Sequence, residues 1–404
     1  MHRILVDEKR WFDEGRFLHA LSFCTLLPGP EAQQLATYLG WCLHGTRGGL
    51  AAGILFVLPG FAAILALSLV YTLFGELPAV SAIFYGIKAA VLALVLEAAL
   101  RIGRRVLTGR MQRVVAGLAF GALFLFSVPF PLVVLAAGAL GAVASAVSPG
   151  LFALPPAEPT AAPVLRGGPA RTLRMLAVFL PLWLGPTAIC ALVRGPGDVF
   201  TQLGLFFSQA AVVTFGGAYA VLAYVAQRAV ETYGWLSARE MLDGLGLAET
   251  TPGPLIMVVQ FVGFLAAYRH GDVSSPIVAG MIGSVLTTWV TFVPSFLWIF
   301  LGAPYVERLR REPKLAAALQ TIMAAVVGVI ANLAVWFALH VVFARVDVLR
   351  LAGLRVSVPD WTSLDPYALA LSLAACVALL RLHAGLAATL AGSALAGLAI
   401  GLIR

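Results

Sequence analysis

The tripeptide Pro-Gly-Pro occurs twice in this chain, each time inside long apolar sequence. The copies are Pro28-Gly29-Pro30 (the first break) and Pro252-Gly253-Pro254 (the second break). Two prolines around a glycine end one helix and start another, because proline lacks a backbone donor and clashes with the preceding turn. The first amides of the new helix are unpaired and carry partial positive charge. Each break is therefore a candidate anion site that needs no basic side chain.

Uncharged hydrogen-bonding side chains accompany both breaks. Polar groups at membrane depth usually face the protein interior or a water-filled path. Amides and hydroxyls can donate hydrogen bonds to the oxygens of an oxyanion without leaving a buried charge unpaired. We predict that such donors bind substrate together with the six residues of the two breaks. The predicted donors are Gln33, Gln34, Thr250, Thr251 and Gln260.

Two carboxylates lie beside the breaks, Glu31 and Glu249. An ionised carboxylate would repel an anionic substrate, and burial favours the protonated form. Either residue could therefore carry a proton that is coupled to transport. A glutamate that stabilises a helix N-terminus is the alternative, and both interpretations stay open.

A further interruption is predicted at Phe215-Gly216-Gly217 (the third break), inside an apolar span expected over residues 199–224. A glycine inside a helix weakens it by about 1 kcal/mol and permits a kink or a close backbone approach. Packing alone would explain these glycines equally well. We include the three residues in the predicted substrate site.

An internal repeat relates the first two breaks. Residues 2–30 align without a gap on residues 226–254. The identical pairs include Val6 with Val230, Trp11 with Trp235, Leu18 with Leu242, and Leu21 with Leu245. Repeats that carry Gly/Pro-interrupted apolar segments at matching positions indicate the binding site of a secondary transporter.

The composition is that of a membrane protein. The chain is 61% hydrophobic and 11% charged, with a mean hydropathy of +0.95, whereas soluble chains are about 45–50% apolar and about 25% charged. Apolar runs such as residues 48–74 are continuous rather than alternating, which indicates helices and not a barrel. We predict an all-α polytopic membrane protein with roughly ten to thirteen membrane segments, in which residues 31–43 and 48–74 are separate helices.

The repeat and the composition divide the chain into three parts. Residues 1–148 form an N-terminal transporter repeat, residues 149–172 a Pro/Ala/Gly-rich linker, and residues 173–404 a C-terminal repeat. The apolar span over residues 199–224 precedes the repeated segment in the second half and has no counterpart in the first. Either the first repeat lacks its first helix, or the true start of the protein lies upstream of Met1. We favour the second interpretation.

Several function classes have no support in the sequence. The chain contains no GxxxxGK[ST] loop, HExxH, GxSxG or carboxylate pair at metal spacing, so we expect no ATP motor, enzyme, metal or cofactor. The net charge of +8 is explained by basic cytoplasmic loops, such as residues 101–113, with an anionic substrate as the alternative use. No nucleic-acid partner is expected. Glycine pairs with GxxxG spacing are expected to pack helices, namely Gly49/Gly53, Gly117/Gly121 and Gly397/Gly401.

Four sequence motifs, two in each half and in the order expected of the family, resemble the chromate ion transporter family in its long two-repeat form. They are LLPGPEAQQLATYLGW (26–41), FVLPGF (56–61), TFGGAYAVL (214–222) and ETTPGPLIMVVQFVGF (249–264). The resemblance implies a multi-pass protein of the bacterial inner membrane that exports chromate, confers chromate resistance and uses the proton motive force. It also implies a Phe-Gly-Gly helix in the first half, which this sequence lacks.

Other functions stay open at this stage. Uptake or exchange of sulfate or another tetrahedral oxyanion is the first alternative, since sulfate shares the shape and charge of chromate. A non-transport enzyme or structural subunit of the membrane is a remote alternative. The expected partners are the oxyanion, protons or another coupling ion, and the lipid bilayer. Whether the protein forms a homodimer is left open.

Overall fold

The computed structural model describes residues 1–147, 168–215, 217–302, 312–351 and 354–403. Most of the linker expected at 149–172 lies outside this part, as does Gly216. The first half contains η1 (Arg3–Glu8), α1 (Glu14–Cys24), α2 (Glu31–Phe74), α3 (Pro78–Val106), α4 (Arg110–Phe126) and α5 (Phe130–Val147). The second half contains α6 (Pro169–Arg194), α7 (Val199–Val213), α8 (Ala218–Ala226), η3 (Gln227–Thr232), α9 (Ala238–Thr250), η4 (Leu255–Met257), α10 (Val258–His270), α11 (Pro276–Gly302), α13 (Pro313–Val342), β1 (Val346–Leu351), β2 (Leu354–Pro359), η6 (Trp361–Ser363), α14 (Pro366–Leu380) and α15 (Leu386–Ile403).

The predicted class, an all-α polytopic membrane protein, is confirmed. Within the described residues, seven helices are long and apolar enough to cross a membrane, and three shorter apolar helices accompany them. The α11 and α13 helices are mostly buried inside the bundle, whereas α6 and α15 expose most of their apolar surface. Such exposed apolar faces suit contact with lipid. The chain is thus a multi-pass membrane protein.

The α2 element is a hairpin of two helices, as the sequence predicted. His44 and Gly45 have non-helical backbone angles. A Cβ on Gly49 would lie 3.0 Å from the carbonyl oxygen of Thr37. A straight helix from Thr37 to Gly49 would separate these positions by about 18 Å. The chain therefore reverses at residues 44–45, and the two arms pack against each other through glycine.

The expected single span over residues 199–224 is instead two helices, α7 and α8. The helix ends at Thr214, whose backbone is extended, and Gly217 has a φ of +98°. This left-handed conformation suits glycine, because a side chain there would be strained. The interruption predicted at the third break is thus more than a kink.

The internal repeat is visible in the local structure. The segments η1 and η3 are both π-helical, and they begin at residues that the sequence alignment pairs, Arg3 and Gln227. The helices α1 and α9 also begin at paired residues, and side-chain caps, Asp13 and Ser237, precede them. Both helices lead into a Pro-Gly-Pro break. The sequence repeat is therefore a structural repeat over this region.

The equivalent tryptophans of the two repeats differ in burial. Trp235 is 2% exposed, and its ring contacts those of Phe206 and Phe207 in α7. Trp11, at the equivalent position, is 58% exposed. The helix that covers the second tryptophan has no equivalent over the first among the described residues. The expectation of a missing first helix stays a prediction.

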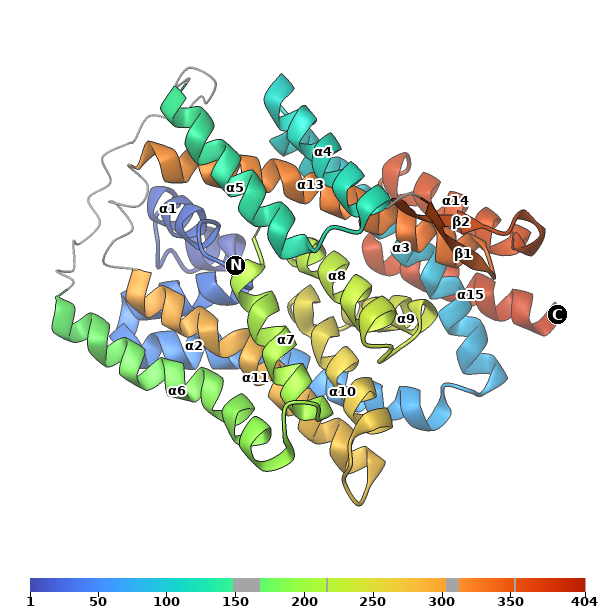
Figure 1. The fold of residues 1–404 in the computed structure, drawn as a ribbon, viewed down its shortest axis with the longest axis horizontal. Coiled ribbons are helices and arrows are strands. Elements are labelled where there is room, and N and C mark those ends of the chain that lie inside the picture. Colours follow the sequence, from blue (N-terminus) through green and yellow to red (C-terminus); the bar gives the residue numbers. More distant parts are fainter. Residues whose placement is uncertain (148–167, 216, 303–311, 352–353, 404) are drawn as a thin grey trace.

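A long helix of each half packs against helices of the other half. The α3 helix packs against α14 and α15, and α13 packs against α4 and α5. The α3 and α13 helices also contact each other. Figure 1 shows α8 and α9 near the middle of the molecule, with α7 on one side and α3 on the other. Each half thus depends on the other for much of its packing.

Two of the three GxxxG pairs pack helices as predicted. Gly49 and Gly53 face Phe300 and Phe296 of α11, and Gly397 and Gly401 face Ala82 and Gly86 of α3. The prediction is wrong for Gly117 and Gly121, because a Cβ at either position would meet none of the described residues within 4 Å. GxxxG spacing places two glycines on one helix face, but it does not decide whether a neighbouring helix covers that face.

Gly86→Leu is expected to destabilise the protein. A Cβ at Gly86 would overlap the Ser393 carbonyl and lie 3.1 Å from the Gly397 Cα. Overpacking of this kind costs about 1–3 kcal/mol. Thermal unfolding in detergent should therefore occur at a lower temperature. Gly392→Leu is the matched control, because no atom of the residues that the structure describes lies within 4 Å of a Cβ at Gly392. Equal unfolding temperatures for the two variants would contradict the packing argument.

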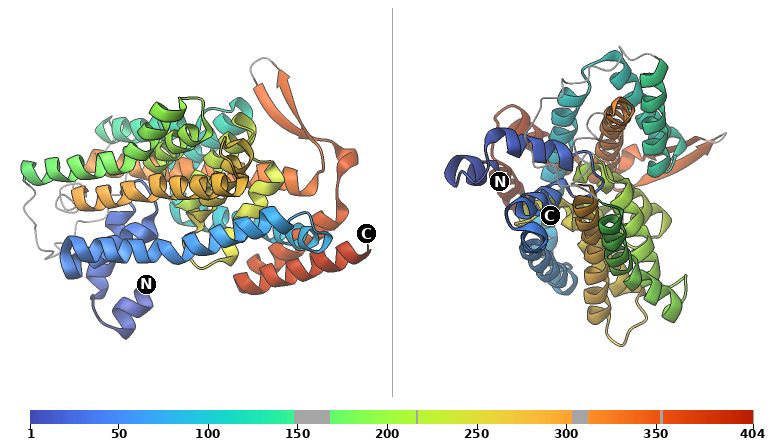
Figure 2. Two further views of the ribbon diagram at one scale, coloured as in Figure 1. Left: turned by 90° about the horizontal axis from the view of Figure 1, so that it is seen from below. Right: turned by 90° about the vertical axis from the view of Figure 1, so that its left-hand side faces the viewer.

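A two-stranded antiparallel sheet was not predicted. Strands β1 and β2 pair from Val346 opposite Pro359 to Leu351 opposite Leu354. Alternating apolar and polar residues in LRVSV (354–358), and in the first three residues of VDVLRL (346–351), favour strands over helix here. The left view of Figure 2 shows the sheet extending beyond the helices.

Candidate functional site

The first break is buried at Gly29 and Pro30 and is held by two hydrogen bonds. Gly29 has a φ of +117°, and its N–H donates to the carbonyl oxygen of Thr214 at 2.9 Å. The side-chain amide of Gln34 donates to the Pro28 carbonyl oxygen at 2.6 Å. A Cβ on Gly29 would lie 2.9 Å from Ser295 Oγ and Gln34 Nε2. The glycine therefore allows the break to approach polar groups of both halves.

The second break lies against a proline-containing turn of α2. Gly253 has a φ of +143°, and a Cβ there would lie 2.9 Å from the Cα of Gly60. Gly60 follows Pro59, which interrupts the helical hydrogen bonding of α2. Gln260 of α10 donates from Nε2 to the Phe61 carbonyl oxygen at 3.0 Å. The break and the predicted donor Gln260 thus contact the same proline-containing turn.

The two breaks occupy related environments. Pro294-Ser295-Phe296 in α11 resembles Pro59-Gly60-Phe61 in α2, with a small residue between proline and phenylalanine in each. The first break contacts Ser295 and the second contacts Gly60, so each break packs beside a proline inside a helix of the other half. The sequence analysis missed Ser295. The match between FVLPGF and the FVPSF of residues 292–296 is the signal that could have found it.

The third break connects the other two. Thr214, just before it, accepts the hydrogen bond from Gly29 of the first break. Tyr219, just after it, donates from its hydroxyl to Glu249 Oε1 at 2.6 Å, close before the second break. The chain from Thr214 to Tyr219 can span at most about 18 Å. The structure therefore brings the three predicted breaks to one region, although they are far apart in the sequence.

Buried amides and a hydroxyl near the breaks have unused hydrogen-bonding capacity. Gln33, Gln34, Gln260 and Ser295 are fully buried. Gln33 donates to Thr37 Oγ1 at 3.3 Å. Within the described part of the chain, the amide oxygens of all three glutamines and the Ser295 hydroxyl have no hydrogen-bond partner. Buried polar atoms normally have one, so these groups are available to a substrate or to water. Each glutamine can present either its oxygen or its NH₂ group.

The predicted donors Thr250 and Thr251 lie at the C-terminal end of α9. Their hydroxyls donate to the carbonyl oxygens of Leu247 and Ala248, at 2.9 and 3.2 Å. In this arrangement both hydroxyl protons are engaged within α9. Their role as substrate donors stays a prediction.

The two candidate proton carriers lie at opposite sides of their breaks. Glu31 is the first residue of α2, directly after the first break, and Arg105 of α3 lies within electrostatic range of it. Glu249 precedes the second break and is bound by Tyr219. Glu31 is partly buried. The proton-coupling role of both residues is likewise a prediction.

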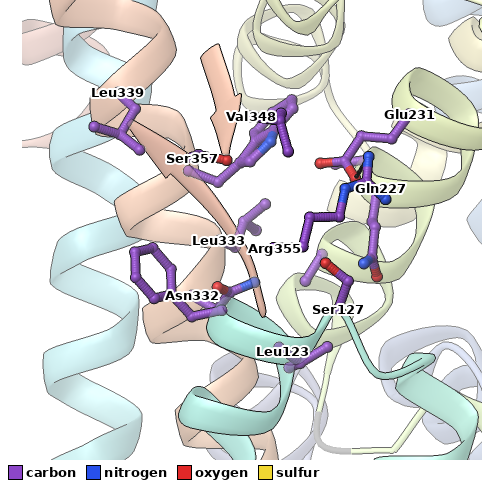
Figure 3. Close-up of a pocket in the computed structure, with 14 residues that line it drawn as sticks. Leu123, Ser127, Gln227, Glu231, Asn332, Leu333, Leu339, Val348, Arg355 and Ser357 are labelled. Atoms are coloured by element: carbon purple, nitrogen blue, oxygen red, sulfur yellow. Dashed lines mark ion pairs between the residues drawn. The ribbon is translucent and has the colours of Figure 1, made fainter. Parts of the chain in front are cut away.

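A pocket elsewhere in the protein is polar but contains none of the predicted site residues. It lies between α13, η3 and the β-sheet, and Figure 3 shows Arg355 and Glu231 facing each other in it. These two residues form an ion pair at 3.5 Å. The pocket's arginine is thus already neutralised. In the described part of the chain no three His, Cys, Asp or Glu side chains are grouped to hold a metal ion.

Broken helices inside a repeat-built helical bundle, with buried uncharged donors around them, are typical of membrane transport proteins. A family model described as chromate transporter matches residues 1–142 and 201–398. The chain belongs to this family, as its sequence motifs suggested.

Curated relatives support the assignment. The chain is similar to a chromate transport protein of Pseudomonas aeruginosa, with 34% identity covering 82% of this chain and 73% of the relative. It is 29% identical to a probable chromate transport protein of Synechococcus elongatus, covering 82% of this chain and 77% of the relative. A chromate transport protein of Cupriavidus metallidurans is 28% identical, covering 82% of this chain and 74% of the relative. No solved structure matches the chain.

Proposed function

We propose that this protein is a secondary active transporter that exports chromate across the bacterial inner membrane and so confers chromate resistance. The single observation that carries the proposal is that two hydrogen bonds bring the three breaks together. One joins Gly29 to Thr214, and the other joins Tyr219 to Glu249. The family membership, and the chromate transport proteins among the relatives, indicate the substrate.

Substrate binding would use the helix starts and the amides together. The amides that open α2 and η4 supply partial positive charge without a basic side chain. The fully buried Gln33, Gln34 and Gln260 would complete the coordination of a tetrahedral dianion. Rocking of one repeat against the other would then alternate access to this site. Glu31 and Glu249 are the candidates beside the breaks for the proton that is exchanged for substrate.

The chemistry of the site does not by itself select chromate over sulfate. Both are tetrahedral dianions, and neutral donors recognise shape and negative charge rather than the central atom. Uptake or exchange of sulfate is therefore the second candidate. Competition by sulfate during chromate transport separates the two.

The chromium content of cells exposed to chromate tests the proposal. Cells that express this chain should contain less chromium than cells that carry the empty vector, and they should grow at higher chromate concentrations. A higher content would indicate uptake and favour the sulfate-type alternative. An unchanged content, with the protein present in the membrane, would contradict chromate transport by this chain.

A further inference from the structure

An ion pair is buried between the two halves, apart from the residues discussed so far. Lys88 of α3 places Nζ 3.2 Å from Asp243 Oδ1 of α9. The hydroxyl of Tyr71, near the end of α2, donates to Asp243 Oδ2 at 2.9 Å. The carboxylate belongs to the second half, and both partners belong to the first. The contacts of Asp243 therefore depend on the relative position of the two repeats.

Burial makes this pair costly. The Asp243 side chain is 5% exposed, the least of any carboxylate in the ion pairs of the described residues, and that of Lys88 is 19% exposed. Desolvation of two charges can exceed their mutual attraction, so a buried pair adds little net stability. Ionisable residues inside membrane helices are rare and usually functional. Among the described residues, Lys88 is the one lysine in the middle of a helix.

The pair is in contact with the candidate site through one aromatic residue. The rings of Tyr71 and Phe261 meet edge to face, with centroids 5.2 Å apart. Phe261 follows Gln260 in α10, and it also packs on the backbone of Gly244, next to Asp243. Along the α9 helix, Asp243 and Thr250 are separated by about 10 Å. A change at the carboxylate can thus displace both α9 and α10 at the second break.

The repeat places a second titratable group at the equivalent position. In the alignment of residues 2–30 on residues 226–254, Asp243 corresponds to His19 of α1, which is also buried. Both helices that lead into a Pro-Gly-Pro break therefore carry a group that can gain or lose a proton. A purely structural repeat does not require this.

We propose that Asp243, in place of the two glutamates beside the breaks, carries the proton that drives transport, with Lys88 and Tyr71 as its positioning residues. This inference rests on the proposed transport function. A proton from one side of the membrane binds an oxygen of Asp243 and converts the ion pair into a neutral carboxyl beside an ammonium. Its release to the other side restores the pair. The other charges near the group are Glu240, one turn earlier on α9, and Arg269 of α10, and these two form an ion pair with each other.

Proteoliposomes that contain the purified full chain test the proposal in two assays. The first measures chromate exchange at equal pH on both sides, and the second measures chromate accumulation driven by a pH gradient. Asp243→Asn is expected to keep exchange but to lose gradient-driven accumulation completely. Glu76→Gln, an exposed carboxylate in the turn between α2 and α3, is the matched control and should keep both activities.

The outcomes separate this inference from the proposed function. If the wild-type protein transports no chromate, the proposed function fails. If the wild type transports chromate but does not respond to a pH gradient, or if Asp243→Asn accumulates it normally, only the assignment of Asp243 is overturned. A double variant, Lys88→Gln with Asp243→Asn, removes both charges and guards against misfolding. It should also exchange without accumulating. The proposal would be overturned if both variants were absent from the membrane, or if both lost exchange as well as accumulation. Either result would show that the ion pair serves to stabilise the fold.

Discussion

Gly253→Leu is expected to abolish chromate transport while the protein still reaches the membrane. Gly253 has a φ of +143°, and a Cβ there would lie 2.9 Å from the Cα of Gly60, which cannot move as a side chain would. Backbone strain of this kind costs about 1–3 kcal/mol, which lowers the population of the native conformation of the break roughly 5- to 150-fold. The steric overlap with Gly60 adds to this cost. The second break must therefore open or shift away from α2.

The measurement is chromate flux in proteoliposomes, normalised to the amount of protein in the membrane. Gly117→Leu is the matched control, because it introduces the same side chain where a Cβ has no neighbour within 4 Å in the described structure. The control should transport at the wild-type rate. Normal flux in Gly253→Leu would show that the second break is no part of the substrate path.

Gln34→Leu is expected to produce the second-largest loss. Its side-chain amide donates to the Pro28 carbonyl oxygen at 2.6 Å, and the residue is fully buried. Leucine has a similar size but no donor, so the carbonyl would be left unpaired at a cost of about 1–3 kcal/mol. The same substitution removes one of the amides available to an oxyanion. We expect the transport rate to fall by about tenfold or more.

Gln202→Leu serves as its control. Gln202 of α7 also donates from its amide to a backbone carbonyl oxygen, that of Gly197, at 3.1 Å, but this bond lies at the protein surface. Water can replace the lost partner there, so transport should be unchanged. Equal effects of the two substitutions would indicate a general loss of helix stability. Separate measurement of the chromate concentration for half-maximal flux would then show whether Gln34 contributes to binding.

The sequence by itself determined the class of protein and the local positions of its interruptions. Continuous apolar runs require helices in lipid, because every backbone polar group must be paired within the segment. The Pro-Gly-Pro tripeptides predict where these helices stop, since proline and glycine act on their own backbone. The repeat also recurs in the structure, where η1 and η3, and α1 and α9, begin at matching residues.

The tertiary structure decided which interruptions meet. Gly29 lies against Thr214 and Ser295, and Gly253 lies against Gly60, in each case across the boundary between the halves. Such contacts depend on how distant helices pack, and no local pattern encodes that packing. For the same reason the sequence predicted the packing of Gly117 and Gly121 wrongly. The sequence also does not single out Asp243, whose partners Lys88 and Tyr71 come from distant helices. Charge on one helix becomes informative only when the structure shows which group on another helix balances it.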